Sequence, residues 1–299
     1  MLDPNSRHVY LEELRPPTGY ILDQAVATTY SLNLLTLLAA PLAFARFDLN
    51  KKDNILDDPI SVLEAIRRTA GKFSIFCETG GIKVPSSANP LFQFLEKAVI
   101  EVHAPNPAGI FHPKIWVLRF NEEKGDGIAY RFLCLSRNLT FDRSWDTVLT
   151  LEGQVRRRAF ARNRPLSDFL KSLIEMANKP ISEELKLSIL EMAEELRHVD
   201  FIPPENIEDF KFYPLGIQGY RRFPIREEYS RLLVVSPFLS DGLVQRIAKN
   251  GSGNVLISRS EELDLLERKT LEPYGKIFVL DEAAGQEDEL SIEVSSDAA

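Results

Sequence analysis

Short runs rich in Val, Ile, Thr and aromatic residues alternate, along the first half of the chain, with longer runs whose apolar residues have helical spacing. The β-branched runs predict strands at 21–30, 73–77, 99–103, 115–120, 129–135 and 147–151. The helical runs predict helices at 32–47, 61–69 and 90–97, the first of them ended or kinked by Pro41. Strands that alternate with helices in this way predict an α/β layered fold.

The second half begins with two helical patterns, at 166–177 and 182–197, which are joined by Lys179-Pro180. Ser182 before two glutamates is typical of a helix N-terminus. Further on, strands are expected at 232–235, 255–257 and 277–280, and a helix at 241–249. These patterns predict a first lobe at 1–160, a helical connector at 161–204 and the start of a second lobe at 205–299. The tail from Asp281 has seven acidic residues and no basic one, so it is expected to be disordered.

Charge and cysteine content narrow the class of protein. The chain of 299 residues has a net charge of −8, so the whole molecule is not a general polyanion binder. The stretch 114–164 holds eleven basic and six acidic residues, which makes it the electropositive part. Cys77 and Cys134 lie in apolar, strand-like runs, which predicts buried, reduced thiols in a cytosolic protein.

No membrane or secretory segment is expected from the sequence. The first residues lack the basic region and apolar core of a signal peptide. The longest apolar stretch, 32–45, contains Asn33 and Pro41 and is too short to span a bilayer. A cytoplasmic protein without membrane contact is therefore expected.

Two polar clusters in apolar surroundings carry the candidate chemistry. His112 and Lys114 are two residues apart, so on a strand they point to the same face. Ser136 and Asn138 have the same spacing on the next predicted strand, with Arg137 between them. A histidine, a fixed positive charge and hydrogen-bond donors that converge on one spot suit a phosphate or an oxyanion.

These two clusters resemble the core motif of the phospholipase D superfamily, His-x-Lys followed by Ser-x-Asn one strand later. Leu139-Thr140 extends the likeness to the nuclease-like branch. The carboxylate that usually opens the next strand is best matched by Asp146, with Glu152 as second choice. Arg119 stands where the fuller family motif has an aspartate, a departure that weakens a lipid-hydrolase interpretation more than a nuclease one. The resemblance implies a mixed central sheet flanked by helices.

The resemblance also implies a role for each residue in phosphodiester hydrolysis. His112 would attack phosphorus as a neutral imidazole and form a phosphohistidine. Lys114 and Asn138 would hold the non-bridging oxygens, and Ser136 would orient ligand or side chains. Asp146 would hydrogen-bond the histidine ring. No metal or cofactor is required.

Several arginines are candidate phosphate or nucleic-acid contacts, each with a structural alternative. Arg131 and Arg137 either contact phosphate or are solvated at a sheet edge. Arg156 and Arg157 belong to a basic cluster that either contacts a nucleic-acid backbone or forms a solvated helix face. His103, Trp116 and Trp145 are expected to be structural.

The family builds one active site from two His-x-Lys lobes, and this chain has one such motif. Its four histidines are His8, His103, His112 and His198. The chain is therefore expected to be a fragment whose second motif lies beyond Ala299, to pair with a second copy, or to carry a degenerate second lobe. The leading hypothesis is a metal-independent nuclease for DNA, in a restriction or phage-defence setting. A phospholipase or phosphatidyl transferase, and a non-catalytic phosphate- or nucleic-acid-binding module, remain as alternatives.

Overall fold

The computed structural model describes most of the chain in two compact units, 1–222 and 223–299. The described residues are 10–45, 59–69, 71–83, 90–107, 109–141, 146–205, 207–220, 224, 229–248 and 253–281. The predicted tail beyond Asp281 lies outside them.

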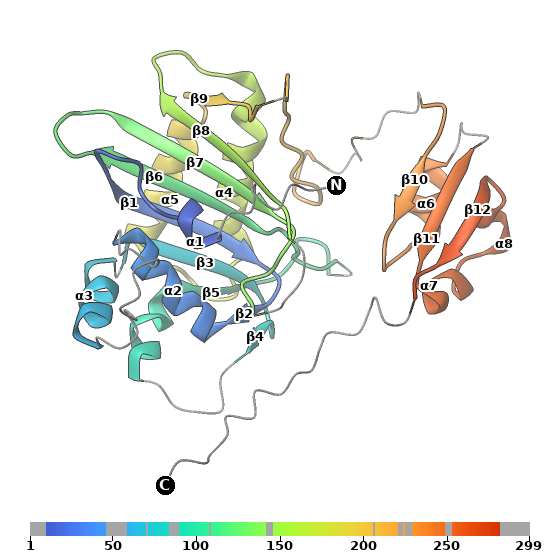
Figure 1. The fold of residues 1–299 in the computed structure, drawn as a ribbon, viewed down its shortest axis with the longest axis horizontal. Coiled ribbons are helices and arrows are strands. Elements are labelled where there is room, and N and C mark those ends of the chain that lie inside the picture. The colour runs from blue at the N-terminus through green and yellow to red at the C-terminus, as the bar shows by residue number, and fades with distance from the viewer. Residues whose placement is uncertain are drawn as a thin grey trace, which may run out of the picture. The chain divides into compact units, whose positions relative to one another are not determined.

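A seven-stranded sheet is the centre of the first unit, in the order β5-β3-β1-β6-β7-β8-β9 (Figure 1). Its strands are β1 (Tyr20–Thr29), β3 (Phe73–Glu78), β5 (Val99–Val102), β6 (Ile115–Glu122), β7 (Ile128–Leu135), β8 (Val148–Val155) and β9 (Val199–Ile202). β1, β3 and β5 are parallel, whereas β6 to β9 pair antiparallel with their neighbours. The predicted α/β fold with a mixed, helix-flanked central sheet is confirmed.

Alternate residues of each strand pack against helices on opposite faces of this sheet. On one face, Val117 and Phe132 belong to a core shared with α4 (Arg164–Met176) and α5 (Glu183–Leu196). On the other face, Trp116 and Leu133 join a core with α2 (Leu34–Phe44). Figure 1 shows α4 and α5 behind the sheet. The buried Trp116 confirms its expected core position.

The smaller elements of the first unit complete its surface. They are α1 (Tyr10–Glu13), α3 (Pro59–Thr69), the paired strands β2 (Leu32–Asn33) and β4 (Ile82–Lys83), and the 3-10 helices η3 (Pro90–Phe94), η4 (Glu96–Ala98) and η5 (Ala161–Asn163). Two expectations are corrected here. Pro41 does not end α2, because the helix continues to Phe44 and buries Leu42, Ala43 and Phe44; a kink at Pro41 stays a prediction. The helix expected at 90–97 is two separate 3-10 turns.

The predicted helical connector, 161–204, is part of the first unit. Both α4 and α5 bury an apolar face against the sheet, and β9 extends its edge. The amphipathic spacing of these helices is therefore a core-facing pattern, and the boundary between the units follows Arg222. Ser182 caps α5 as expected, since its hydroxyl accepts a hydrogen bond of 3.2 Å from the Leu185 amide.

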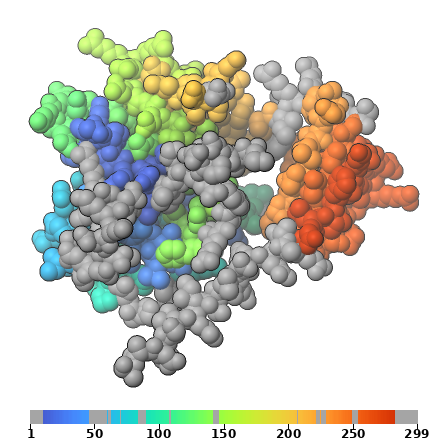
Figure 2. Space-filling view, in the orientation of Figure 1, coloured from blue at the N-terminus to red at the C-terminus, as the bar shows by residue number. Residues whose placement is uncertain are grey.

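The second unit is a three-stranded parallel sheet with short helices. Its elements are β10 (Leu233–Val235), α6 (Asp241–Ile247), β11 (Asn254–Ser258), α7 (Ser260–Asp264), α8 (Arg268–Leu271) and β12 (Tyr274–Val279). Val244, Leu256 and Tyr274 are buried in its core. Figure 2 shows its side chains, orange to red, packed into one body. That 205–299 begins a second phospholipase D-like lobe stays a prediction.

The two cysteines differ in exposure, which corrects the expectation that both are buried. Cys77 is buried in β3. Cys134 is exposed near the end of β7, at the sheet edge where the strand runs into Ser136.

Within the described part of the chain, no helix is both long and apolar enough to cross a membrane.

Candidate active site

The two predicted motifs meet at one edge of the central sheet. The register pairs Thr28 with Ile115 and Leu135 with Val148, so the carboxyl ends of β1 and β7 lie beside the amino ends of β6 and β8. His-x-Lys immediately precedes β6, and Ser-x-Asn immediately follows β7. Strand pairing therefore brings together residues that are more than twenty positions apart in the sequence.

His112 and Lys114 contact each other directly. Lys114 Nζ lies 3.1 Å from Nδ1 and 3.0 Å from Nε2 of His112. Both residues lie in the loop before β6 and not within the strand, but their side chains still meet, as their spacing predicts. The Leu135 amide donates to the Lys114 carbonyl at 2.9 Å and ties this loop to the end of β7.

Thr28, on β1, braces the backbone on both sides of Lys114. Its buried hydroxyl donates to the Pro113 carbonyl at 3.0 Å and accepts from the Ile115 amide at 3.2 Å. These two bonds fix the backbone from which the lysine side chain projects.

The neighbouring Thr29 braces the second motif in the same way. Its hydroxyl accepts from the Leu139 amide at 3.1 Å, donates to the Ser31 carbonyl at 2.7 Å and lies 3.5 Å from Asn138 Oδ1. Two successive threonines of β1 therefore hold both motifs in place. The sequence does not reveal this role, because a Thr that braces a distant loop has no local feature that distinguishes it from an ordinary strand residue.

Asp146 lies beside the second motif. Ser136 Oγ donates to Asp146 Oδ1 at 2.8 Å and accepts from the Thr147 amide at 2.9 Å. The Arg137 guanidinium pairs with Asp146 Oδ2 at 3.4 Å. The structure thus unites Ser136, Arg137 and Asp146, and the role of Asp146 as partner of the His112 ring stays a prediction.

Two further residues border His112 that the motifs do not include. The Tyr30 ring lies 5.1 Å from the His112 ring, centroid to centroid, at an interplanar angle of 53°. Glu78 Oε2 accepts a hydrogen bond of 2.7 Å from the Phe111 amide, the residue before the histidine. Tyr30 follows β1 and Glu78 ends β3, so the site draws on the ends of several neighbouring strands.

Burial and charge set the protonation of the pair. Partial burial, and then the Lys114 ammonium, lower the pKa of His112 from its ordinary value. Burial also lowers the pKa of Lys114. A neutral imidazole beside an ammonium is the combination that a nucleophile for an anionic phosphodiester requires.

Arg131 lies away from this site. The register places it opposite Leu118, well inside the sheet. Its guanidinium binds the Glu152 carboxylate and donates to the carbonyls of Glu13 and Arg15 at 2.6 and 2.8 Å. Both Arg131 and Glu152 therefore hold the N-terminal segment against the sheet, a structural role in place of the expected phosphate contact.

Arg156 and Arg157 also lie away from the site. Both are exposed, and they follow the far end of β8, eight residues beyond Thr147. At about 3.3 Å per strand residue the separation is about 26 Å. The structure does not bring this pair to the motifs, and its contact with a nucleic-acid backbone stays a prediction. Trp145 lies outside the described residues.

Among the residues that the structure describes, no three His, Cys, Asp or Glu side chains gather into a group able to hold a metal ion.

Comparisons with known proteins give a distant likeness of fold. No protein-family model and no curated protein matches the sequence. A mutant of yeast tyrosyl-DNA phosphodiesterase is similar in structure, with a TM-score of 0.34, 16% identity and coverage of 60% of this chain and 36% of that one. A polyphosphate kinase from Porphyromonas gingivalis is similar with a TM-score of 0.35, 13% identity and coverage of 84% and 35%. The chain thus spans about a third of each of these structures.

Proposed function

We propose that this protein is a phospholipase D-like phosphodiester hydrolase that cleaves nucleic acid, with His112 as nucleophile. The observation that supports the proposal is the contact of His112 with Lys114 at the sheet edge where Ser136 and Asn138 also lie. His112 and Lys114 immediately precede β6, and Asn138 follows β7. The antiparallel pairing of β6 with β7 holds these two chain segments side by side.

In the proposed reaction, a ring nitrogen of neutral His112 attacks phosphorus. The phosphorus–nitrogen bond forms as the bond to the leaving oxygen breaks. Water then cleaves the phosphohistidine and releases the histidine and a phosphomonoester. Lys114 and Asn138 stabilise the non-bridging oxygens, on which charge builds up in both steps.

The leaving oxygen needs a proton, and the proposal assigns this to a second lobe or a second copy of the chain. A histidine from that partner protonates the leaving oxygen and then takes a proton from the attacking water. The partner is therefore part of the working site, and the scheme includes no metal or cofactor.

Cleavage of single-stranded and duplex DNA in the presence of EDTA tests the proposal. We expect wild-type protein to produce fragments and His112→Ala to produce none. His198→Ala is the matched control and should cut at the wild-type rate, because His198 immediately precedes β9, beside the end of β8 that is far from the motifs. Cleavage that requires added Mg²⁺, or that survives His112→Ala, would contradict the proposal.

A second candidate is a phosphate-binding module without turnover. It is favoured by one observation, the closeness of the Lys114 ammonium to both ring nitrogens of His112, which leaves neither nitrogen clear of the cation. DNA binding without fragments, in a preparation at high protein concentration, would support this candidate. Release of choline from phosphatidylcholine vesicles would instead indicate a phospholipase.

A further inference from the structure

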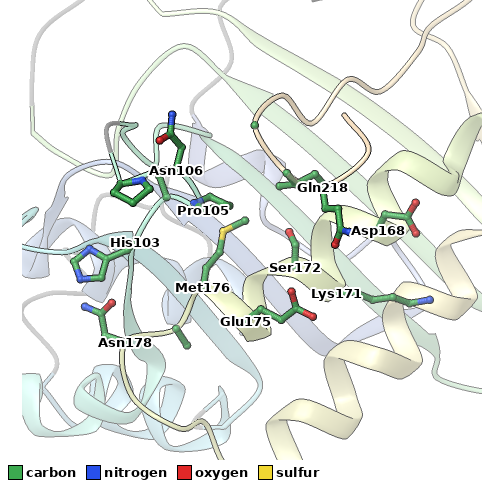
Figure 3. Close-up of a pocket in the computed structure, with 15 residues that line it drawn as sticks. His103, Pro105, Asn106, Asp168, Lys171, Ser172, Glu175, Met176, Asn178 and Gln218 are labelled. Carbon is green, nitrogen blue, oxygen red and sulfur yellow. The ribbon is translucent and has the colours of Figure 1, made fainter. Parts of the chain in front are cut away.

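A hollow separate from the candidate active site lies on the first unit, at the carboxyl end of β5. It has a volume of about 1410 Å³, and its lining comes from the loop after β5, from α4 and from the turn at 216–218. Met176 and Ile217 are buried and form an apolar floor. In Figure 3, the side chains of Ser172, Glu175 and Gln218 lie next to that of Met176.

One face of α4 and a turn anchored to that helix form two walls of the hollow. Asp168, Ser172, Glu175 and Met176 recur at helical spacing and therefore share one face of α4. Tyr220 donates its hydroxyl to Asp168 Oδ2 at 2.7 Å, which anchors the turn that carries Gln218 onto the helix.

The hydrogen-bonding groups of the hollow suit a neutral ligand with donors. The Glu175 carboxylate and the Gln218 amide are exposed at the hollow, and within the described part of the chain neither is held by another protein group, so both can exchange water for a ligand. Of the charged lining residues, Asp168 pairs with Arg164 at 3.6 Å and Lys171 with Glu194 at 3.8 Å, which leaves the Glu175 carboxylate as the acceptor available to a ligand. This acceptor disfavours a phosphate, but it favours a flat group with an exocyclic amine, such as cytosine or adenine.

The hollow and the candidate active site share one connection. Residues 103–107 line the hollow, and the same β5–β6 connection ends in His112 and Lys114. β5 and β6 are three strand spacings apart in the sheet, or about 15 Å. With about 3.4 Å per nucleotide in a stacked strand, a nucleic acid held at His112 reaches the hollow within about four nucleotides.

We infer that this hollow receives one unstacked, amine-bearing base of a single-stranded nucleic acid whose phosphodiester bond lies at His112. The inference rests on the proposed nuclease function and adds its substrate class. Single strands are recognised through bases that are turned out and hydrogen-bonded along their edges, and Glu and Gln are suited to amine-bearing edges.

Cleavage mapping on thymine strands that contain one cytosine or one adenine tests the inference. We expect the bond at a fixed offset, within about four nucleotides of the single base, to be cut at least about fivefold faster than the other bonds. Glu175→Gln and, separately, Gln218→Ala should bring this ratio close to one. Glu208→Gln, an exposed glutamate outside the hollow, is the matched control and should keep it. Thermal melting checks that each variant is folded.

The outcomes separate the two proposals. Cleavage of every bond at equal rate by folded wild-type protein overturns the base site and leaves the nuclease standing. Preferential cleavage that persists in both folded hollow variants also overturns the base site. Absence of any cleavage, by a preparation in which the partner lobe or copy is present, overturns the nuclease function itself. If the preference for one bond near the single base is lost in Glu175→Gln and Gln218→Ala but kept in Glu208→Gln, both the nuclease function and the base site are supported.

Discussion

The ammonium of Lys114 lies almost equally close to both ring nitrogens of His112, at 3.0 and 3.1 Å. A proton on either nitrogen would face this positive charge, and the partial burial of the ring weakens its hydration. Both effects, burial first, lower the pKa of His112. In the unfolded chain the ring binds a proton more readily, so the histidine favours unfolding as the pH falls below its ordinary pKa of 6.5.

Lys114→Met should raise the pKa of His112 toward its ordinary value. Part of the depression should remain, because the burial of the ring is unchanged by this substitution. NMR titration of the His112 ring protons measures the shift, and Lys186→Met on the exposed surface of α5 is the control. An unchanged or lower His112 pKa in Lys114→Met would show that the contact is not electrostatically important.

Thr28→Val should lower both stability and activity. The substitution keeps the volume and β-branching but leaves the buried Ile115 amide without its acceptor at 3.2 Å, a loss of about 1–3 kcal/mol. Thr28→Ser keeps the hydroxyl and is the matched control. Urea unfolding measures the stability and cleavage rate the activity. Equal behaviour of the Val and Ser variants would show that the hydroxyl does not position the loop.

Strand pairing explains why the sequence could predict part of this site. His112-x-Lys114 and Ser136-x-Asn138 flank two strands joined by a short turn, so antiparallel pairing had to bring them together. Thr28 and Thr29 act across 85 and 110 residues of sequence, and no local pattern encodes such a contact.

Strand length explains why the basic cluster at Arg156 and Arg157 lies away from the two motifs. The strand expected to end at Leu151 continues to Val155, since Gly153 and Gln154 extend the ladder with β7 and β9. Each added residue carries the chain about 3.3 Å farther, which takes Arg156 away from the motif edge. The prediction of a separate helical connector at 161–204 was wrong for a different reason. Helical spacing alone does not reveal which surface a helix packs against.

Gly81→Ala should disturb the surroundings of His112. A Cβ at this position would lie 2.1 Å from the Tyr30 carbonyl oxygen and 2.9 Å from that of Glu78, and both are backbone atoms that cannot simply rotate away. The displaced turn carries the Tyr30 ring that packs on His112. We expect reduced cleavage and a lower melting temperature. Gly242→Ala, where a Cβ meets nothing within 4 Å, is the control and should be tolerated.

The two cysteines should differ in reactivity toward thiol reagents. Burial raises the pKa of both thiols, that of Cys77 to about 12 with the help of Glu101 and Glu78, whereas Lys114 partly offsets the rise at Cys134. Cys134 is exposed and Cys77 is buried, so a reagent reaches Cys134 first. Native protein should therefore consume about one equivalent of 5,5′-dithiobis(2-nitrobenzoate) quickly, with Cys134 identified by peptide mass spectrometry. Cys134→Ser should abolish the fast phase. Equal reaction of both thiols in folded protein would contradict the burial of Cys77.

The Arg119 guanidinium joins the sheet to α5 in a partly buried network. It donates to both Glu195 oxygens, at 2.7 and 2.9 Å, and also pairs with Asp23. The Tyr130 hydroxyl donates to Glu195 Oε2 at 2.6 Å. Burial alone would raise the pKa of Glu195, but the hydrogen bonds from Arg119 and Tyr130 outweigh it and hold the pKa below its ordinary value. Arg119 therefore has a structural role in the first unit.

Arg119→Met should destabilise the first unit by about 3 kcal/mol, because it leaves two carboxylates without their cation while the aliphatic stem is kept. The double variant Arg119→Met/Glu195→Leu should lose less free energy of unfolding than the two single variants lose together, because Glu195→Leu removes the charge that Arg119→Met leaves unpaired. The Glu195 contribution is present above the ordinary carboxyl pKa and is lost as the pH falls, so the difference between wild type and Arg119→Met should shrink in acid. Urea unfolding at neutral and acidic pH measures both effects. Strictly additive losses at all pH values would show that Arg119 and Glu195 are not energetically coupled.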